Sequence, residues 1–186
     1  NILSSQPPAS LTLTALSGIP LLNPGDNLVS IILHSLKQSN LSLENGDILV
    51  IAQKVVSKAD GRYARLADIS PSERAFKLAE ITGKDPRLVE LILSESREIV
   101  RHSKRTIQSS GVVVAENNHG VVLANAGIDS SNVGSESEDE KVLLLPIDPD
   151  KSSETINKEL QLKFKVRLAV IINDSLGRAW RNGTTG

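Results

Sequence analysis

Val121-Val-Leu-Ala-Asn-Ala-Gly-Ile-Asp-Ser-Ser-Asn-Val133 is the stretch of this chain that says most about its fold and its chemistry. Its first four residues are apolar and predict a buried strand that ends at Asn125 and Gly127. The carboxylate of Asp129 follows at once, together with two hydroxyls and an amide in residues 130–132. A strand end that carries several oxygen donors suits the ligation of a hard divalent cation.

A second strand end has the same character further along the chain. The apolar run 168–172 passes into Asn173, Asp174 and Ser175, with a glycine close by. Either aspartate alone would most simply cap a turn. Two of them, each just past an apolar strand and each followed by a hydroxyl, match the one or two carboxylates that Mg²⁺ or Mn²⁺ takes beside substrate phosphates. We therefore expect Asp129 and Asp174 to converge on a metal and phosphate site.

Basic residues lie close to these strand ends or to a further one. Lys54 and Lys58 follow the apolar strand 47–52, where a point charge could hold a phosphate, although a pair of lysines is usually a solvated edge. The run Arg178-Ala-Trp-Arg181 places two arginines after the second strand end, which suits an anionic substrate. His119 is most simply a turn residue. The chain has neither a GxxxxGK[ST] loop nor a GxGxxG loop, so no standard motif argues for nucleotide binding.

The composition argues against several classes of function. The chain has 186 residues, which suits one large domain or two small ones, and only 2% of them are aromatic. Few aromatic residues and a net charge of -1 argue against nucleic-acid binding and against a broad hold on anionic lipid. The absence of Cys excludes disulfides and thiolate metal sites, and it is compatible with a reducing cytoplasm. No apolar run approaches the ~20 residues of a membrane span.

The order of elements predicts an α+β fold with mixed sheets, an αα-hairpin and flanking helices, because strands and helices do not alternate strictly. Asp26 is expected to cap the first helix, and the strand 47–52 is apolar enough to be buried on both faces. An acidic stretch, 134–140, reads as a solvated loop. Strands are expected at 11–22, 47–52, 111–115, 121–124, 143–145 and 166–172, and helices around 28–36, 71–82, 86–99 and 151–162.

The αα-hairpin carries the clearest local signals. Ser70-Pro-Ser-Glu73 predicts a helix start with Ser70 as N-cap, Pro71 in the first turn and Glu73 closing a capping box. That helix should end at Gly83. Asp85-Pro86 repeats the signal for a second helix. The side chains expected to be buried are Ala75, Phe76, Leu78, Ala79 and Ile81 in the first helix and Leu88, Leu91, Ile92 and Ile99 in the second.

Several stretches together resemble the coenzyme F-420-0:L-glutamate ligase family, the γ-glutamyl ligases that add glutamate to the deazaflavin coenzyme F-420. They occur in the family's order from about residue 17 to the end of the chain. The matching stretches are Gly18-Ile-Pro-Leu21, Gly46 to Gly61, Pro71 to Ala75, Gly83 to Glu90, His119-Gly120, Asn125 to Val133, Leu143 to Asp150 and Asp174 to Arg178.

The resemblance implies a GTP-dependent ligase with two divalent metal ions, Mg²⁺ or Mn²⁺, and K⁺ as a further candidate. It implies a cytoplasmic homodimer that acts on F-420-0, L-glutamate and GTP. The γ-phosphate of GTP would convert the terminal carboxylate of F-420-0 to an acyl phosphate, which the amine of glutamate attacks. The family's GTP-contacting positions fall on Gly18, Ile19, Pro20, Leu21, Gln53, Lys54, Lys58 and Asn132, its metal ligands on Asp129, Asp174 and Ser175, and the catalytic roles on Asp129, Asp174 and Lys58.

Some residues depart from the family's pattern. Ser175 stands where many members have Thr, which keeps the hydroxyl, and Gln53-Lys54 replaces a small hydroxyl pair of some members. The family's domain continues beyond residue 186 with a Gly-rich nucleotide-contacting segment and another metal ligand, so we expect this chain to be part of a longer protein. Residues 1–16 are assigned to an N-terminal extension with the first strand, and 17–186 to the N-terminal and central part of the ligase domain. A metal-dependent phosphatase or hydrolase and a non-catalytic nucleotide- or deazaflavin-binding protein are the alternatives.

Overall fold

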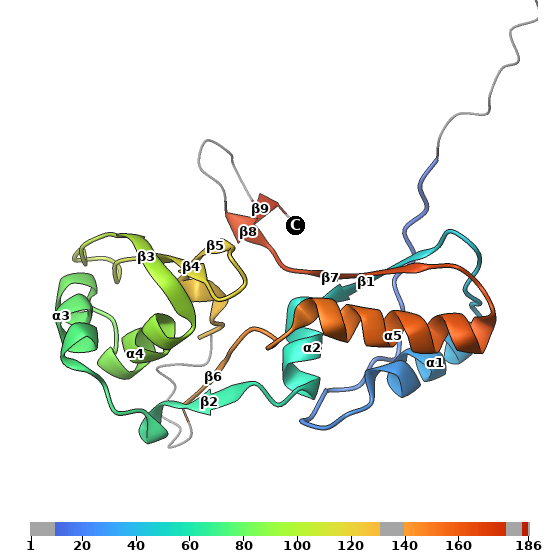
Figure 1. Cartoon of the computed structure of the whole chain (residues 1–186), viewed down its shortest axis with the longest axis horizontal. Helices are drawn as coiled ribbons and strands as arrows, with labels where there is room; N and C mark the ends of the chain where they lie inside the picture. Colours follow the sequence, from blue (N-terminus) through green and yellow to red (C-terminus); the bar gives the residue numbers. More distant parts are fainter. Residues whose placement is uncertain (1–9, 131–139, 178–183, 186) are drawn as a thin grey trace, which may run out of the picture.

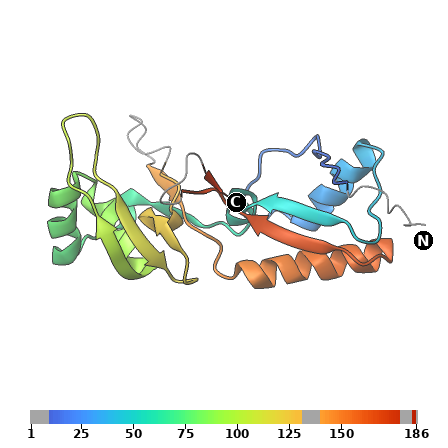
Figure 2. The same cartoon turned by 90° about the horizontal axis from the view of Figure 1, so that it is seen from above.

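Two lobes lie side by side along the long axis of the molecule (Figure 1, Figure 2). The computed structural model describes residues 10–130, 140–177 and 184–185. The parallel lobe consists of α1 (Leu28–Gln38), β1 (Ile48–Ala52), α2 (Gln53–Ala59), α5 (Pro149–Phe164) and β7 (Ala169–Asn173). The hairpin lobe consists of η1 (Leu66–Asp68), α3 (Glu73–Thr82), α4 (Pro86–Ser94), β3 (Ser96–His102), β4 (Val113–Asn117), β5 (Val122–Ala124) and η2 (Asn125–Gly127). The expected α+β class with an αα-hairpin is confirmed.

A short ladder joins the two lobes. β2 (Tyr63–Arg65) pairs antiparallel with β6 (Lys141–Leu143), so the chain enters the hairpin lobe on one strand and returns to the parallel lobe on the other. After β7, the strands β8 (Leu176–Gly177) and β9 (Thr184–Thr185) pair with each other near the junction of the lobes (Figure 1).

The parallel lobe is built on one pair of strands. β1 and β7 run parallel, with Ile48 opposite Ala169 and Ala52 opposite Asn173. One face of the pair packs against α1 and α5, while Ile48 and Val50 on the other face are 58% and 57% exposed. The prediction that residues 47–52 are buried on both faces is therefore wrong, because the described helices cover only one face. The buried hydrophobic cluster of this lobe consists of Val29, Ile32, Leu36, Ile51, Val56, Ile156, Leu160 and Leu168.

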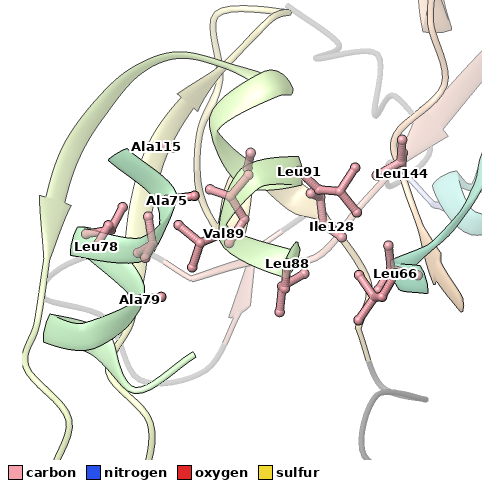
Figure 3. Close-up of a cluster of buried hydrophobic side chains, with 14 residues drawn as sticks. Leu66, Ala75, Leu78, Ala79, Leu88, Val89, Leu91, Ala115, Ile128 and Leu144 are labelled. Carbon is pink, nitrogen blue, oxygen red and sulfur yellow. The ribbon is translucent and has the colours of Figure 1, made fainter. Parts of the chain in front are cut away.

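The hairpin lobe packs α3 and α4 against a three-stranded antiparallel sheet in the order β3-β4-β5. Val89 and Ile92 on α4 are completely buried, and Val113 and Ala115 on the inner face of β4 belong to the same core cluster. Figure 3 labels Val89 and Ala115 within this cluster. Leu144, which directly follows β6, and the turn residue Ile128 belong to the same cluster. Because Ile128 directly precedes Asp129, this core fixes the backbone from which the first predicted metal ligand projects.

The αα-hairpin is confirmed, but its first cap is displaced by two residues. Ser72, not Ser70, is the N-cap of α3, and its side chain accepts from the backbone N–H of Ala75 at 3.2 Å. Glu73 is then the first helical residue and closes no capping box. Glu90 from α4 takes that role instead, since its carboxylate accepts from the backbone N–H of Ser72 at 2.7 Å. These hydrogen bonds, first of all those from Ser72, hold the pKa of Glu90 below its usual value.

The predicted cap of α4 is confirmed, and the predicted cap of α1 is wrong by one residue. Asp85 caps α4 by accepting from the backbone N–H of Arg87 at 2.8 Å, with Pro86 in the first position, as predicted. The cap of α1 is Asn27 rather than Asp26. The carboxylate of Asp26 instead closes the preceding turn by accepting from the N–H of Asn23.

Three further expectations are wrong. Residues 11–22 form no strand and pair with none of the described strands. Phe76 and Ile81 lie on the outer face of α3 and are 54% and 40% exposed, whereas Ala75, Leu78 and Ala79 take the inner face. Ile99 belongs to β3 rather than to α4, because α4 ends at Ser94. The hairpin 111–124, the helix around 151–162 and the final strand are confirmed in slightly different bounds.

The displaced cap yields a direct test. Ser72→Ala removes the hydroxyl that accepts from Ala75, so the free energy of unfolding should fall by about 1 kcal/mol. Ser70→Ala, at an exposed position outside the helix, should change it by less than about 0.5 kcal/mol. Urea denaturation of both variants measures the difference. A larger loss in the Ser70 variant would restore the original cap prediction.

Candidate functional site

The turn before Asp129 has an unusual backbone. Three consecutive residues, Asn125, Ala126 and Gly127, have φ of 51°, 55° and 82°, in the left-handed region. This conformation costs a non-glycine residue roughly 1–2 kcal/mol, and backbone strain of this kind concentrates at functional sites. Within the described residues, the side-chain oxygen of Asn125 is buried and accepts no hydrogen bond. The turn is therefore strained, and the side-chain oxygen of Asn125 is a buried acceptor four residues before Asp129, the first predicted metal ligand.

Asp129 is clamped in place by its own backbone. It forms an isolated two-bond bridge with Leu143, the N–H of each residue donating to the carbonyl of the other at 2.9 and 3.0 Å. Its side chain, 31% exposed, accepts from the ammonium of Lys54 at 2.9 Å. Lys54 belongs to α2, so this contact joins the hairpin lobe to the parallel lobe.

The charge of Asp174, the second predicted metal ligand, also acts on Lys54. The hydrogen bond to Asp129 is the largest cause that raises the pKa of Lys54, followed by the Coulombic attraction of Asp129, and Asp174 adds its own attraction. Asp174 lies between β7 and β8, on the side of the parallel lobe. Two carboxylates from opposite lobes thus act on one ammonium group. The convergence of the two strand ends stays a prediction, which this attraction favours.

A cavity of about 260 Å³ opens beside Asp174 at the junction of the lobes. Most of its wall is apolar, and its polar lining comes from Gln53, Asn117, His119, Asn173 and Asp174. The Ser175 N–H donates to the carboxylate of Asp174 at 2.8 Å, which orients that side chain. The cavity thus places one carboxylate in a wall that is mostly apolar.

Sequence reasoning missed the residues that shape this cavity. His119 was interpreted as a turn residue, and its ring nitrogen Nε2 lies 2.9 Å from the carbonyl of Pro146. Arg62 donates through Nε to the neighbouring carbonyl of Leu145 at 2.8 Å and forms an ion pair with Glu95 at 3.1 Å. The sequence signals were the family match of His119-Gly120 and the polar turn 117–120, whose Asn117 side chain accepts from the N–H groups of residues 119 and 121.

The remaining predicted residues are distributed as follows. Gln53, Lys54 and Lys58 lie on α2 rather than on the expected strand exit, and Lys54 and Lys58 occupy one face of that helix at a spacing of four. The segment 18–21 lies at the end of α1, where Ser35 donates to the carbonyl of residue 17 at 2.5 Å. Ile19 borders a second cavity together with Ala52 and Val55, next to the start of α2. Asn132, Trp180, Arg178 and Arg181 lie outside the described residues.

The donor set fits a hard divalent cation. It offers the carboxylates of Asp129 and Asp174 and the hydroxyl of Ser175, all oxygen donors. In the described ranges 10–130, 140–177 and 184–185, no group of three or more His, Asp or Glu side chains could hold a metal by itself. A cation at this place would complete its coordination with phosphate or water oxygens, as Mg²⁺ commonly does.

A family model described as F420-0:Gamma-glutamyl ligase matches residues 18–186. The chain belongs to this family. Among curated relatives, it is 44% identical over 176 residues to a coenzyme F420:L-glutamate ligase of Methanothermobacter thermautotrophicus, covering 95% of this chain and 66% of the relative. It is 42% identical to the enzymes of that name from Methanocaldococcus jannaschii, with 77% and 53% covered, and Methanopyrus kandleri, with 88% and 59% covered.

The match with the curated relatives is partial. The chain spans between about half and two thirds of the length of the curated relatives it matches. Among the residues that the structure describes, no helix is both long enough and apolar enough to cross a bilayer.

The strained turn provides a test of how Asp129 is positioned. Gly127→Ala would place a Cβ 2.8 Å from Leu145 and 3.1 Å from Leu123 at a φ of +82°, so strain and overlap add. We expect the free energy of unfolding to fall by more than about 2 kcal/mol. Gly25→Ala is the matched control, since its φ is +88° but nothing lies within 4 Å, and it should lose only about 1 kcal/mol. Equal losses in thermal or urea unfolding would contradict the tight packing of this turn.

Proposed function

We propose that the full-length protein is a ligase that joins L-glutamate to F-420-0 in an amide bond, at the expense of GTP and with a divalent cation. The observation that carries the proposal is the ammonium of Lys54, which bonds the carboxylate of Asp129 at 2.9 Å and is attracted by that of Asp174, together with the small cavity that Asp174 lines at the lobe junction. Family membership supports the same reaction, because the curated relatives are named coenzyme F420:L-glutamate ligases.

The reaction would proceed in two balanced steps. A carboxylate oxygen of F-420-0 attacks the γ-phosphorus of GTP, which forms an acyl phosphate and releases GDP. The nitrogen of glutamate then attacks the acyl carbon, an N–C bond forms, and the C–O bond to phosphate breaks. Lys54 and Lys58 would hold phosphate oxygens, because a lysine ammonium is a compact donor to phosphate. Glycine 18 and residues 19–21, with Gln53 and Asn132, complete the proposed GTP-contacting set.

Asp129, Asp174 and Ser175 would hold Mg²⁺ or Mn²⁺. Bound there, the cation would neutralise charge on the phosphate oxygens during transfer. The protein's own contribution is positional: the Leu143 bridge fixes Asp129, and the Ser175 N–H orients Asp174. Lys54 already bonds one of these carboxylates, so its ammonium is in place to bridge a carboxylate and a phosphate. K⁺ belongs to the proposal only as a further candidate.

The proposal extends to the assembly and location of the protein. We infer a cytoplasmic homodimer without nucleic-acid or membrane partners. The uncovered apolar face of β1 and β7, with Ile48, Val50 and Ile171 between 45% and 58% exposed, supports association with another protein surface. The low aromatic content and the net charge of -1 support the absence of a nucleic-acid partner.

The deciding experiment is GTP-dependent incorporation of L-glutamate into F-420-0 by the full-length protein. Amide product and GDP in equal amounts are expected, and both should require Mg²⁺ or Mn²⁺. Phosphate release without F-420-0 and glutamate would favour the phosphatase or hydrolase instead. Tight GTP binding without turnover in the presence of Mn²⁺ would favour a non-catalytic binding protein.

The metal ligands are tested by isosteric variants. Asp129→Asn and Asp174→Asn should each lower the metal-dependent turnover by about 100-fold or more, because each removes a negative ligand. Neither should shift the unfolding midpoint by more than a few degrees, since the Lys54 side chain that pairs with Asp129 is 57% exposed and such pairs contribute about 0–1 kcal/mol. Steady-state kinetics and calorimetry provide the two measurements. Unchanged turnover in either variant would refute the metal assignment.

The role of Lys58 is tested separately. Lys58→Ala should raise the KM for GTP by roughly 10- to 100-fold, the loss expected for one hydrogen bond to a charged group. Lys77→Ala on α3 is the control, because that lysine is 72% exposed and, among the described residues, forms its ion pair with Glu73 of the same helix. Titration of GTP in the glutamate incorporation assay measures both. A KM that is the same in the two variants would remove Lys58 from the site.

A further inference from the structure

The side-chain amide of Asn117 is fixed at the wall of the lobe-junction cavity. The residue ends β4, is only 2% exposed and lines the cavity of about 260 Å³. Its Oδ1 accepts hydrogen bonds from the backbone N–H groups of His119 and Val121, both at 3.0 Å. Because both partners are N–H donors, the atom that faces them is the amide oxygen. The orientation of the planar amide is therefore set, and Nδ2 lies on the side away from the turn.

The two hydrogens of this Nδ2 have no protein partner. Within residues 10–130, 140–177 and 184–185, Asn117 makes side-chain hydrogen bonds only through Oδ1. Nδ2 is not sealed inside the protein either, since Oδ1 of Asn125 is the only enclosed side-chain atom without a partner among the described residues. Buried donors in proteins are normally satisfied. A nearly buried amide with unpaired N–H groups at a cavity wall is therefore arranged to donate to a ligand in that cavity.

The rest of the wall favours a neutral acceptor on a carbon skeleton. Among the described lining residues, Asp174 is the only carboxylate, and the proposed function assigns it to the cation; no Lys or Arg is among them. A triphosphate or a free amino acid would find no counter-ion here. A carbonyl group would find the N–H donors of Asn117, and its carbon chain would find an apolar surface. That surface includes Val121, Leu123, Leu145, Ile172 and Leu176.

The other polar side chains of the lining are less suited to donate. Nε2 of Gln53 already donates to the hydroxyl of Ser57 at 2.5 Å. Nε2 of His119 lies 2.9 Å from the carbonyl oxygen of Pro146. No hydrogen bond among the described residues fixes the side-chain direction of Asn173. Asn117 is thus the described lining residue whose donors are both unpaired and held in one direction.

From this arrangement, and resting on the proposed ligase function, we infer that the cavity seats the acyl group of the acyl phosphate and that Nδ2 of Asn117 donates to its carbonyl oxygen. The acyl group belongs beside Asp174, because its phosphoryl group was transferred there. A donor that is fixed in advance stabilises the negative charge that develops on this oxygen more than it stabilises the neutral carbonyl. Asn117 is then a catalytic residue of the second step.

The step is balanced as follows. The amine of glutamate, which has lost its ammonium proton to solvent, attacks the acyl carbon. The N–C bond forms, and an electron pair of the C=O bond moves to the oxygen, where the N–H of Asn117 bonds it. The C=O bond forms again, and the C–O bond to phosphate breaks with its electron pair on the phosphate oxygen. The departing phosphate takes the proton that the nitrogen sheds.

Two variants of the full-length protein separate the donor from the turn. Asn117→Asp keeps an oxygen acceptor for the two N–H groups of the turn and loses the donor. Asn117→Ala loses both but adds no charge. In that variant the turn keeps its backbone hydrogen bonds, from the N–H of Asn117 to Val121 and from the N–H of Gly120 to Asn117, both at 2.9 Å.

The measurement is a single turnover by rapid quench, with the protein in excess over F-420-0 and with GTP and glutamate saturating. GDP reports the first step and amide product the second. Both variants should form amide about 100-fold more slowly or worse, the loss typical of one missing oxyanion donor. GDP should form within a few-fold of the wild-type rate, because no charge develops on the carbonyl oxygen in the first step. GDP formation also reports that the variants are folded.

Three outcomes would overturn the inference. Equal slowing of GDP and amide in Asn117→Ala would show a general effect on the site. Amide formation at the wild-type rate in Asn117→Ala would show that the donor is not used. Amide formation at the wild-type rate in Asn117→Asp would assign the loss in the alanine variant to the turn.

Asn118→Ala is the matched control. This amide is the next residue of the same turn, is exposed, donates to the carbonyl of Ser94 at 3.3 Å and does not line the cavity. Both steps should stay within a few-fold of the wild-type rate. A selective loss of amide formation in this variant as well would also overturn the inference, since any change in the turn would then suffice.

Failure of the proposed function gives a different result. If the full-length wild-type protein forms neither GDP nor amide from GTP, F-420-0 and glutamate, the ligase proposal is wrong, and the role of Asn117 is overturned with it. If the wild type forms both, the ligase chemistry stands. The ratio of the two rates in the variants then decides the role of Asn117 alone.

Discussion

The extended segment 141–146 is the strip of backbone on which both lobes depend. β6 pairs with β2 at its start, and Leu143 exchanges two hydrogen bonds with Asp129. The N–H of Leu144 then donates to the carbonyl of Arg62 at 2.9 Å, and Arg62 returns a side-chain bond to the carbonyl of Leu145. The carbonyl oxygen of Pro146 lies 2.9 Å from Nε2 of His119, within hydrogen-bond distance. Because successive residues of one strip bind different elements, a shift of this backbone would move Asp129 and the cavity wall together.

The two ion pairs that lie near the junction of the lobes, Arg62–Glu95 and Lys54–Asp129, contribute unequally to stability. The Arg62–Glu95 pair is about one fifth to one quarter exposed, and the same guanidinium bonds a carbonyl, so leaving either partner unmatched would cost roughly 1–3 kcal/mol. The Lys54–Asp129 pair is much more exposed and contributes about 0–1 kcal/mol. The lobes are therefore held by the backbone strip and by Arg62. The charged pair at the candidate site adds little stability, so an exchange of partners on the proposed binding of phosphate would cost the fold little.

Local signals in the sequence predicted local structure, and tertiary contacts account for the differences. Asp85-Pro86 is a complete helix start on its own and was predicted correctly, whereas the choice between Ser70 and Ser72 depends on Glu90 reaching back from the next helix. α2 was missed because its seven residues include two adjacent valines and its N-cap, Ala52, makes no side-chain hydrogen bond. No sequence pattern marks it as a helix, so its packing against β1 and β7 decides.

The candidate site shows the same division. Asp129 and Asp174 could be selected because each follows an apolar strand, and the sequence carries that pattern openly. Lys54 could be named as well, but its contact with Asp129, 75 positions away, could not be foreseen, since nothing local encodes it. His119 was assigned to its turn and no further, because its partner carbonyl belongs to a segment 27 residues downstream. A backbone carbonyl leaves no mark on the sequence.

The left-handed turn 125–127 shows why the site is specified more tightly than its polar residues suggest. Ala126 is only 1% exposed, and Gly127 fits between Leu123 and Leu145 with no space for a Cβ. The turn cannot relax to ordinary backbone without moving these leucines, which also line the cavity beside Asp174. The same packing that stores the strain therefore sets both the direction of Asp129 and the shape of the cavity wall. A substitution that relieved the strain by loosening this packing would disturb the carboxylate and the cavity at once, which is a physical reason for the strained turn to persist in a protein that must place both.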